Sequence, residues 1–198
     1  MSAADERRSR IILYALAGSG VLALAIVLAL VFLRNGDNSA KAGNLPTVMA
    51  AAGCTYKEYP NAGRNHLSDI NAKPPKQWNS FPPTSGPHYF QPAIFNQYDQ
   101  PIVELQAVHN LEHGGVIIQY GAGVPQSAID KITTFYRADP NAMIVAPLPS
   151  LKKKIALSSW RHLSTCTAFN EKAFTSFRDT LRYHGPERFP ASSLQPGM

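Results

Sequence analysis

Hydrophobic and polar positions divide the chain into segments with different patterns. Residues 11–33 contain no charged residue and would form a helix of about 34 Å at ~1.5 Å per residue, enough to cross a hydrocarbon core of ~30 Å. Residues 34–53 are mostly small and polar, which predicts a flexible tether. Residues 54–190 carry aromatic residues and regular apolar patterns, which predict one folded domain, and residues 191–198 form a short tail.

The charges around residues 11–33 predict how this segment crosses a membrane. Arg7, Arg8 and Arg10 precede it, whereas only Arg34 follows closely. The positive-inside rule then keeps residues 1–10 in the cytoplasm and exports everything after residue 34, as a single-pass protein of the cell membrane. The segment is too long for the 7–15-residue apolar region of a cleaved signal peptide, so it reads as a signal anchor. Small residues recur at every fourth position, which leaves open a homodimer through this helix: Ala15, Ser19 and Ala23.

The exterior part begins with a long segment that lacks periodicity. Residues 54–99 are dense in proline but also rich in tyrosine, phenylalanine and tryptophan. Disordered linkers are poor in aromatic residues, so this segment is expected to wrap around a scaffold and pack against it.

The remaining sequence shows helix and strand periods. Strands are predicted at 102–108, from the alternation of Val103, Leu105 and Ala107, and at the apolar runs 116–120, 143–146 and 155–160. Helices are predicted at 125–136 and 170–183, the second one ending before Gly185-Pro186. This order predicts an α+β domain, in which a small antiparallel or mixed sheet carries two helices on one face.

The two cysteines, Cys54 and Cys166, both lie in the exterior part. In an oxidising compartment the favoured interpretation is a disulfide. It would close a loop of roughly 110 residues, which the chain-entropy model values at ~4–5 kcal/mol. The alternative is that one cysteine is a metal ligand or a free thiol.

The formal net charge is +6 with histidines neutral. A modest positive excess suits a domain near anionic lipid or a cell-envelope polymer. Nucleic acid is not expected as a partner, because the only basic run is Lys152-Lys153-Lys154 and the predicted compartment is wrong.

The candidate chemistry is concentrated in one short motif, His109-Asn110-Leu111-Glu112-His113. Its spacing matches the H-x-x-E-H pattern of a metalloprotease class, in which histidines hold zinc and the glutamate activates water. If 108–113 form a helical turn, the two histidines project from one face, and Gly114-Gly115 ends the helix. That early end argues against a protease, whose motif lies on a long helix.

Further metal donors must come from elsewhere in the chain. His88 is the leading candidate, because it ends the rigid, proline-rich stretch 82–89, and His66 in the same irregular region is next. Imidazole-rich sites suit Zn²⁺ or Cu²⁺. His162 and His184 are expected to be ordinary surface or hydrogen-bonded histidines.

The stretches PPTSGPHY at 82–89 and VHNLEHGGVIIQY at 108–120 resemble the two signature blocks of a bacterial membrane-anchored family of unknown function, DUF3105. The resemblance extends over roughly residues 54–190. It implies a single-pass topology with an exported domain, and it implies that His88, His109, Glu112 and His113 are signature positions. It supplies no activity and no catalytic role.

Three hypotheses remain open from the sequence. A metal-binding envelope domain requires the nitrogens of His88, His109 and His113 to converge, with His66 or Glu112 contributing. A metal-dependent hydrolase requires in addition an open cleft with Glu112 as general base. A structural or partner-binding module without metal predicts dispersed histidines and an exposed aromatic patch, with four candidate members: Phe81, Tyr89, Phe90 and Phe95.

Overall fold

A mixed five-stranded sheet organises residues 44–198, the part of the chain that the computed structural model describes. Its spatial order is β1-β7-β6-β4-β5. Strands β4 and β5 pair in parallel, and every other neighbouring pair is antiparallel. The strands are β1 (Thr55–Glu58), β4 (Val116–Tyr120), β5 (Met143–Pro147), β6 (Ile155–Ser159) and β7 (His162–Cys166).

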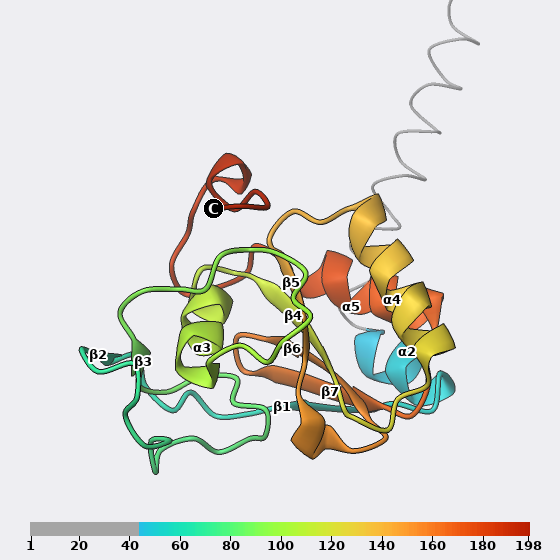
Figure 1. Cartoon of the computed structure of the whole chain (residues 1–198), viewed down its shortest axis with the longest axis horizontal. Coiled ribbons are helices and arrows are strands. Elements are labelled where there is room, and N and C mark those ends of the chain that lie inside the picture. The colour runs from blue at the N-terminus through green and yellow to red at the C-terminus, as the bar shows by residue number, and fades with distance from the viewer. Residues whose placement is uncertain (1–43) are drawn as a thin grey trace, which may run out of the picture. The chain divides into compact units, whose positions relative to one another are not determined.

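Helices cover both faces of this sheet (Figure 1). On one face lie α2 (Leu45–Ala51), α4 (Gln126–Ala138) and α5 (Glu171–Leu181), and on the other lies α3 (Glu104–Glu112). Side chains alternate along β4: Val116 and Ile118 belong to the core under the three helices, and Ile117 belongs to the core under α3. The predicted α+β class and mixed sheet are confirmed, but the prediction of two helices on one face is incomplete.

The strand predicted at 102–108 is wrong, because residues 104–112 form helix α3. The alternation of Val103, Leu105 and Ala107 is accidental. Leu105, Val108 and Leu111 recur at the helical spacing of three, and all three are buried. The structure therefore places the whole His-Asn-Leu-Glu-His motif at the end of a helix, and this helix packs on the sheet.

The strands and helices at 116–120, 125–136, 143–146, 155–160 and 170–183 are confirmed within a few residues of the predicted ends. Helix α4 begins after Pro125, which occupies its N-cap position. At α5 the side chain of Asn170 accepts a hydrogen bond from the Ala173 N–H and caps the helix. The sequence did not predict α2, β1 or β7.

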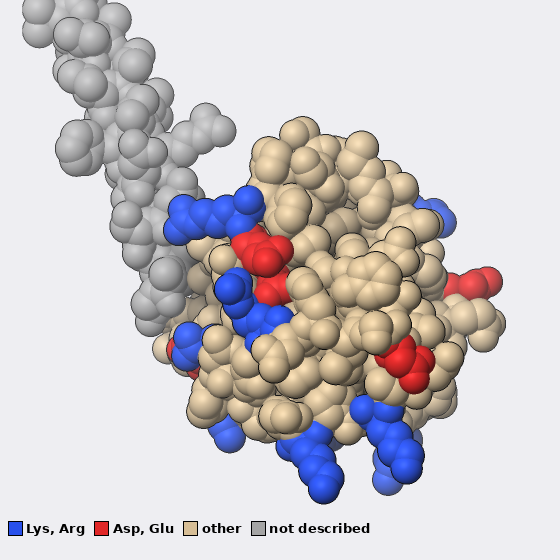
Figure 2. All heavy atoms as spheres, turned by 90° about the vertical axis from the view of Figure 1, so that its left-hand side faces the viewer, with Lys and Arg blue, Asp and Glu red and all other residues tan. Residues whose placement is uncertain are grey.

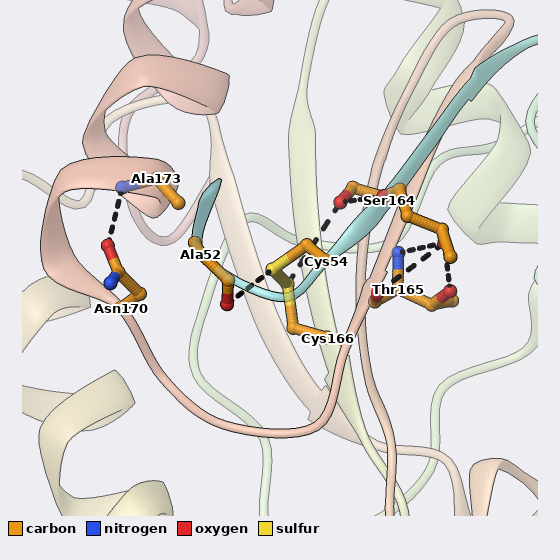
Figure 3. Close-up of a disulfide and its surroundings, with 8 residues drawn as sticks. Ala52, Cys54, Ser164, Thr165, Cys166, Asn170 and Ala173 are labelled. Atoms are coloured by element: carbon orange, nitrogen blue, oxygen red, sulfur yellow. Dashed lines mark hydrogen bonds between the residues drawn. A yellow bond between two sulfur atoms is a disulfide. The ribbon is translucent and has the colours of Figure 1, made fainter. Parts of the chain in front are cut away.

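Helix α2 falls within the stretch where the sequence predicts a flexible tether. Leu45 and Met49 of this helix are buried in the main core, so this part of the stretch belongs to the folded unit. The chain then turns at Gly53 into Cys54, which forms the predicted disulfide with Cys166 at the end of β7 (Figure 3). The disulfide joins α2 and β1 to β7.

The proline-rich segment packs as predicted and contains little regular structure. Its two short strands, β2 (His66–Leu67) and β3 (His88–Tyr89), form a parallel pair beside α3 (Figure 1). Two 3-10 turns complete the elements, η1 (Pro149–Leu151) and η2 (Ala191–Ser193). The C-terminal tail is also part of the fold, because Leu194 is buried and Met198 accepts a backbone hydrogen bond from Phe95.

Within residues 44–198, no helix is long and apolar enough to cross a membrane. Residues 11–33, for which the sequence predicts a transmembrane helix, lie outside the described residues.

Candidate metal centre

Four side chains from three elements converge between α3 and the β2–β3 pair. His66, His88, His109 and Glu112 each offer one donor atom, and these four atoms all lie within 4.8 Å of one another. His88, His109 and Glu112 are buried, whereas the side chain of His66 is 44% exposed. Three imidazoles and a carboxylate at this separation can hold a metal ion.

The loop before His88 is fixed at almost every residue. Residues 82–88 are all buried. Thr84 accepts a backbone hydrogen bond from Arg161, and Trp78 donates its indole N–H to the Pro87 carbonyl. Gly86 has a φ of +120°, and a Cβ there would lie 2.7 Å from the Trp78 ring. His88 is therefore presented by a rigid loop, as the prolines in the sequence predict.

Helix α3 presents His109 and Glu112 on one face, since residues three apart are neighbours on a helix. Asn110 between them is fully buried and points the other way. Its side-chain amide pairs with both backbone groups of Ala93, at 2.9 Å and 2.7 Å. This double hydrogen bond fixes the helix against the proline-rich segment.

His66 and His88 are brought side by side by the parallel pairing of β2 with β3, where they are directly opposed. The ring of His66 also stacks on that of His109, with centroids 4.9 Å apart and planes 4° from parallel. The Nε2 atoms of His66 and His88 lie 3.3 Å and 2.9 Å from the same oxygen, Oε2 of Glu112. Arg64 approaches the other carboxylate oxygen at 3.8 Å.

Backbone carbonyls determine which ring nitrogen faces the centre. Nδ1 of His88 lies 2.8 Å from the Gly86 carbonyl, and Nδ1 of His109 lies 2.8 Å from the Tyr89 carbonyl. A carbonyl oxygen accepts a hydrogen bond, so each Nδ1 carries the proton. Each Nε2 therefore keeps a lone pair that can bind a metal ion in the centre. Metal-binding histidines are commonly oriented by such a partner on the other nitrogen.

The pKa shifts of His109 and Glu112 favour the protonation states that bind a metal ion. Burial lowers the pKa of His109, and the neighbouring histidines lower it further. Burial alone would raise the pKa of Glu112, but the hydrogen bond and charge of His88, together with His66, lower it overall. The carboxylate and the neutral imidazole are the forms that bind a metal ion.

His113 lies next to this group but outside it. Its Nε2 is 2.9 Å from Nε2 of His109 and 3.4 Å from Oε2 of Glu187. Burial and the charge of His109 lower the pKa of His113 to about 4, against the opposing effect of Glu187. The imidazole is therefore neutral near pH 7, and an N–H at its Nε2 can donate to Glu187, which leaves the Nε2 lone pair of His109 to the centre.

Two glycines allow the segment after α5 to reach the end of α3. Gly114 has a φ of +86° and ends the helix, as predicted, and a Cβ there would lie 2.8 Å from the Tyr183 backbone. At Gly185 a Cβ would lie 2.1 Å from the carbonyl oxygen of Glu112. This close contact brings Glu187 to His113.

The structure thus brings together four of the five predicted metal ligands, namely His66, His88, His109 and Glu112. The dispersed histidines expected for a module without metal are not observed. His162 pairs instead with the Tyr56 hydroxyl at 2.9 Å, and His184 is exposed after α5. Arg64 was missed, because nothing in the sequence relates it to Glu112.

Figure 2 looks onto the side of the molecule on which β2 and β3 lie. Acidic and basic side chains are interspersed on it among larger areas of uncharged residues. Two exposed aromatic residues lie near the centre. Phe90 is 53% exposed, and the ring of Phe189 packs on that of His113 with centroids 4.1 Å apart.

Comparison with known families gives a match over most of the folded domain. Residues 70–193, more than half of the chain, match the family described as "Protein of unknown function (DUF3105)". The chain belongs to the DUF3105 family. His88, His109, Glu112, His113 and Glu187 lie within the matched region, whereas His66 and Cys54 precede it. Comparisons with curated proteins and with solved structures found no match.

Proposed function

We propose that this DUF3105 protein binds one transition-metal ion, Zn²⁺ or Cu²⁺, through His66, His88, His109 and Glu112. Three imidazoles and one carboxylate form a donor set that suits either ion. Both ions bind neutral imidazole and ionised carboxylate, the forms that the pKa shifts of His109 and Glu112 favour.

The observation that carries the proposal is the environment of His88. One ring nitrogen faces the Gly86 carbonyl at 2.8 Å and the other faces the Glu112 carboxylate at 2.9 Å. A neutral imidazole has only one N–H, so it cannot donate to both oxygens. A cation between Nε2 and the carboxylate satisfies both atoms, and this cation is either an extra proton or a metal ion. The lone pairs of His66 and His109 beside the same point favour the metal ion.

The position of Glu112 favours a ligand over a general base. Its side chain is 1% exposed, and its Oε2 atom faces His66 and His88 rather than open solvent. A general base must reach a water molecule or substrate. We therefore propose a structural or sequestering metal site rather than a hydrolase.

The proposed location is the exterior face of the cell membrane. The apolar segment 11–33 and the arginines before it support a single-pass anchor with an exported domain. The disulfide between Cys54 and Cys166 supports an oxidising compartment. In such a compartment a histidine and carboxylate site is less exposed to oxidation than a thiolate site.

Elemental analysis of the purified chain tests the proposal. Protein produced with zinc or copper supplied should contain about one ion per chain. The variant His88→Ala/His109→Ala should lose it, because two of four donors are removed. His184→Ala is the matched control, since this histidine is exposed and outside the cluster, and it should retain the ion. A metal-free wild type after metal-replete production would overturn the proposal.

A further inference from the structure

A groove beside the open end of the β6–β7 hairpin, where β6 begins and β7 ends, combines basic and apolar side chains. It has a volume of about 540 Å³, and Phe81, Leu151 and Lys152–Lys154 line it together with three hydroxyl residues. Phe81 is 55% exposed. We call Phe81 and Lys152–Lys154 the lysine surface. Lysine stems cover apolar area while their ammonium groups stay in water, so this surface is apolar in its floor and positive at its rim.

The backbone holds the three lysines in a fixed arrangement. Lys152 has a φ of +58°, which is uncommon for a residue with a side chain. Its carbonyl accepts a hydrogen bond from Gly123 at 2.7 Å, and the Lys154 carbonyl accepts one from Gly121 at 3.0 Å. A Cβ at Gly121 would lie 2.2 Å from the Lys152 oxygen, so only glycine permits this contact. The basic run is therefore a built turn and not a loose loop.

The positive charge of this turn is not neutralised within the domain. Lys152, Lys153 and Lys154 are all exposed. No acidic side chain among residues 44–198 forms an ion pair with any of them. An exposed aromatic ring beside unpaired lysines matches the chemistry of the interface between an anionic bilayer and water.

The lysine surface also lies near the point where the folded domain begins. Asn44 and Asn170 line the same surface pocket. Thr167, three residues before Asn170, lines the lysine groove, so the two features are separated by roughly 10 Å along an extended chain. Residues 34–43 reach at most ~35 Å from the predicted membrane segment. A domain on so short a tether stays close to the bilayer.

We propose that the lysine surface rests on an anionic lipid bilayer, with Phe81 inserted among the headgroups and the three lysines paired with lipid phosphates. This inference rests on the proposed membrane anchor but not on the metal site. Each basic residue near an anionic surface contributes a factor of about five in partitioning, so three lysines together contribute about 100-fold.

Lysine acylation of the full chain in lipid nanodiscs tests the inference. The chain is placed in discs of neutral phosphatidylcholine or of phosphatidylcholine with phosphatidylglycerol, treated briefly with an amine-acylating reagent and analysed by mass spectrometry. Acylation of Lys152–Lys154 should be slowed at least about fivefold in the anionic discs, the factor for a single lysine. Lys131, exposed on α4, is the internal control and should react equally in both discs. Phe81→Ala should weaken the protection, whereas Phe90→Ala, with a ring of similar exposure near the metal centre, should not.

The other outcomes distinguish a failure of the proposed membrane anchor from a failure of the proposed lysine surface. A chain that fails to enter either disc would refute the proposed anchor and with it this inference. A chain that enters both discs and shows equal acylation in both would refute the lysine surface alone. Soluble polyglutamate added to the neutral discs is a further arm. If it slows acylation of Lys152–Lys154 as much as the anionic lipid does, the surface binds an acidic polymer, and the bilayer proposal is overturned.

Discussion

Removing the disulfide gives the best-defined stability prediction. Cys54 and Cys166 are separated by 112 residues along the sequence, and the chain-entropy model gives about 5 kcal/mol for a loop of that length. Cys54→Ala/Cys166→Ala should lower the free energy of unfolding by up to this amount. For a protein of this size, each kcal/mol corresponds to ~2–4 °C, so the melting temperature should fall by about 10–20 °C.

Urea unfolding followed by circular dichroism, with and without a reducing agent, measures this loss. Reduced wild type and the double variant should unfold at the same urea concentration, since both lack only the cross-link. The effect should appear first at α2 and β1, which the disulfide joins to β7. A loss below about 1 kcal/mol would refute the reasoning. It would mean that residual structure in the unfolded chain keeps β1 close to β7 even without the cross-link.

Three further predictions concern single residues. Burial raises the pKa of Glu104 to about 7, so between about pH 4.5 and 7 the folded carboxyl keeps a proton that the unfolded one has lost. Stability should therefore fall as the pH rises through this window, by up to about 3 kcal/mol, and Glu104→Gln should remove the fall in urea titrations. Gly114→Ala should destabilise more than Gly63→Ala in thermal unfolding, because both have a positive φ but only Gly114 meets backbone atoms. His113→Ala should keep about one ion per chain, with metal affinity reduced ~10–100-fold in chelator competition, as expected for a residue beside the ligand set rather than within it.

The sequence predicted three of the five strands, β4, β5 and β6, because these strands are continuous apolar runs. Val116–Tyr120 and Ile155–Ser159 are buried almost throughout, and such runs are recognisable without their neighbours. Strand β1 was missed because it lies at the edge of the sheet and is mostly exposed, so its residues show no apolar alternation. Its position is determined by pairing with β7 and by the disulfide, both of which are long-range.

The metal centre could be predicted in part. The pair His109 and Glu112 follows from local helical spacing, and the rigidity of the loop at His88 follows from its prolines. The contribution of His66 depends on a two-residue strand pairing with β3, which no local pattern signals. The separation of His113 from the group depends on the end of α3 and on Glu187, which approaches from 74 residues downstream.

The central claim is tested most directly by locating the metal. A crystal of the protein grown with zinc should show one anomalous scattering peak about 2 Å from Nε2 of His66, His88 and His109 and from a carboxylate oxygen of Glu112. The same peak should be absent from crystals of the His88→Ala/His109→Ala variant. No peak between these four side chains in the wild type, or a peak held by other residues, would contradict the account.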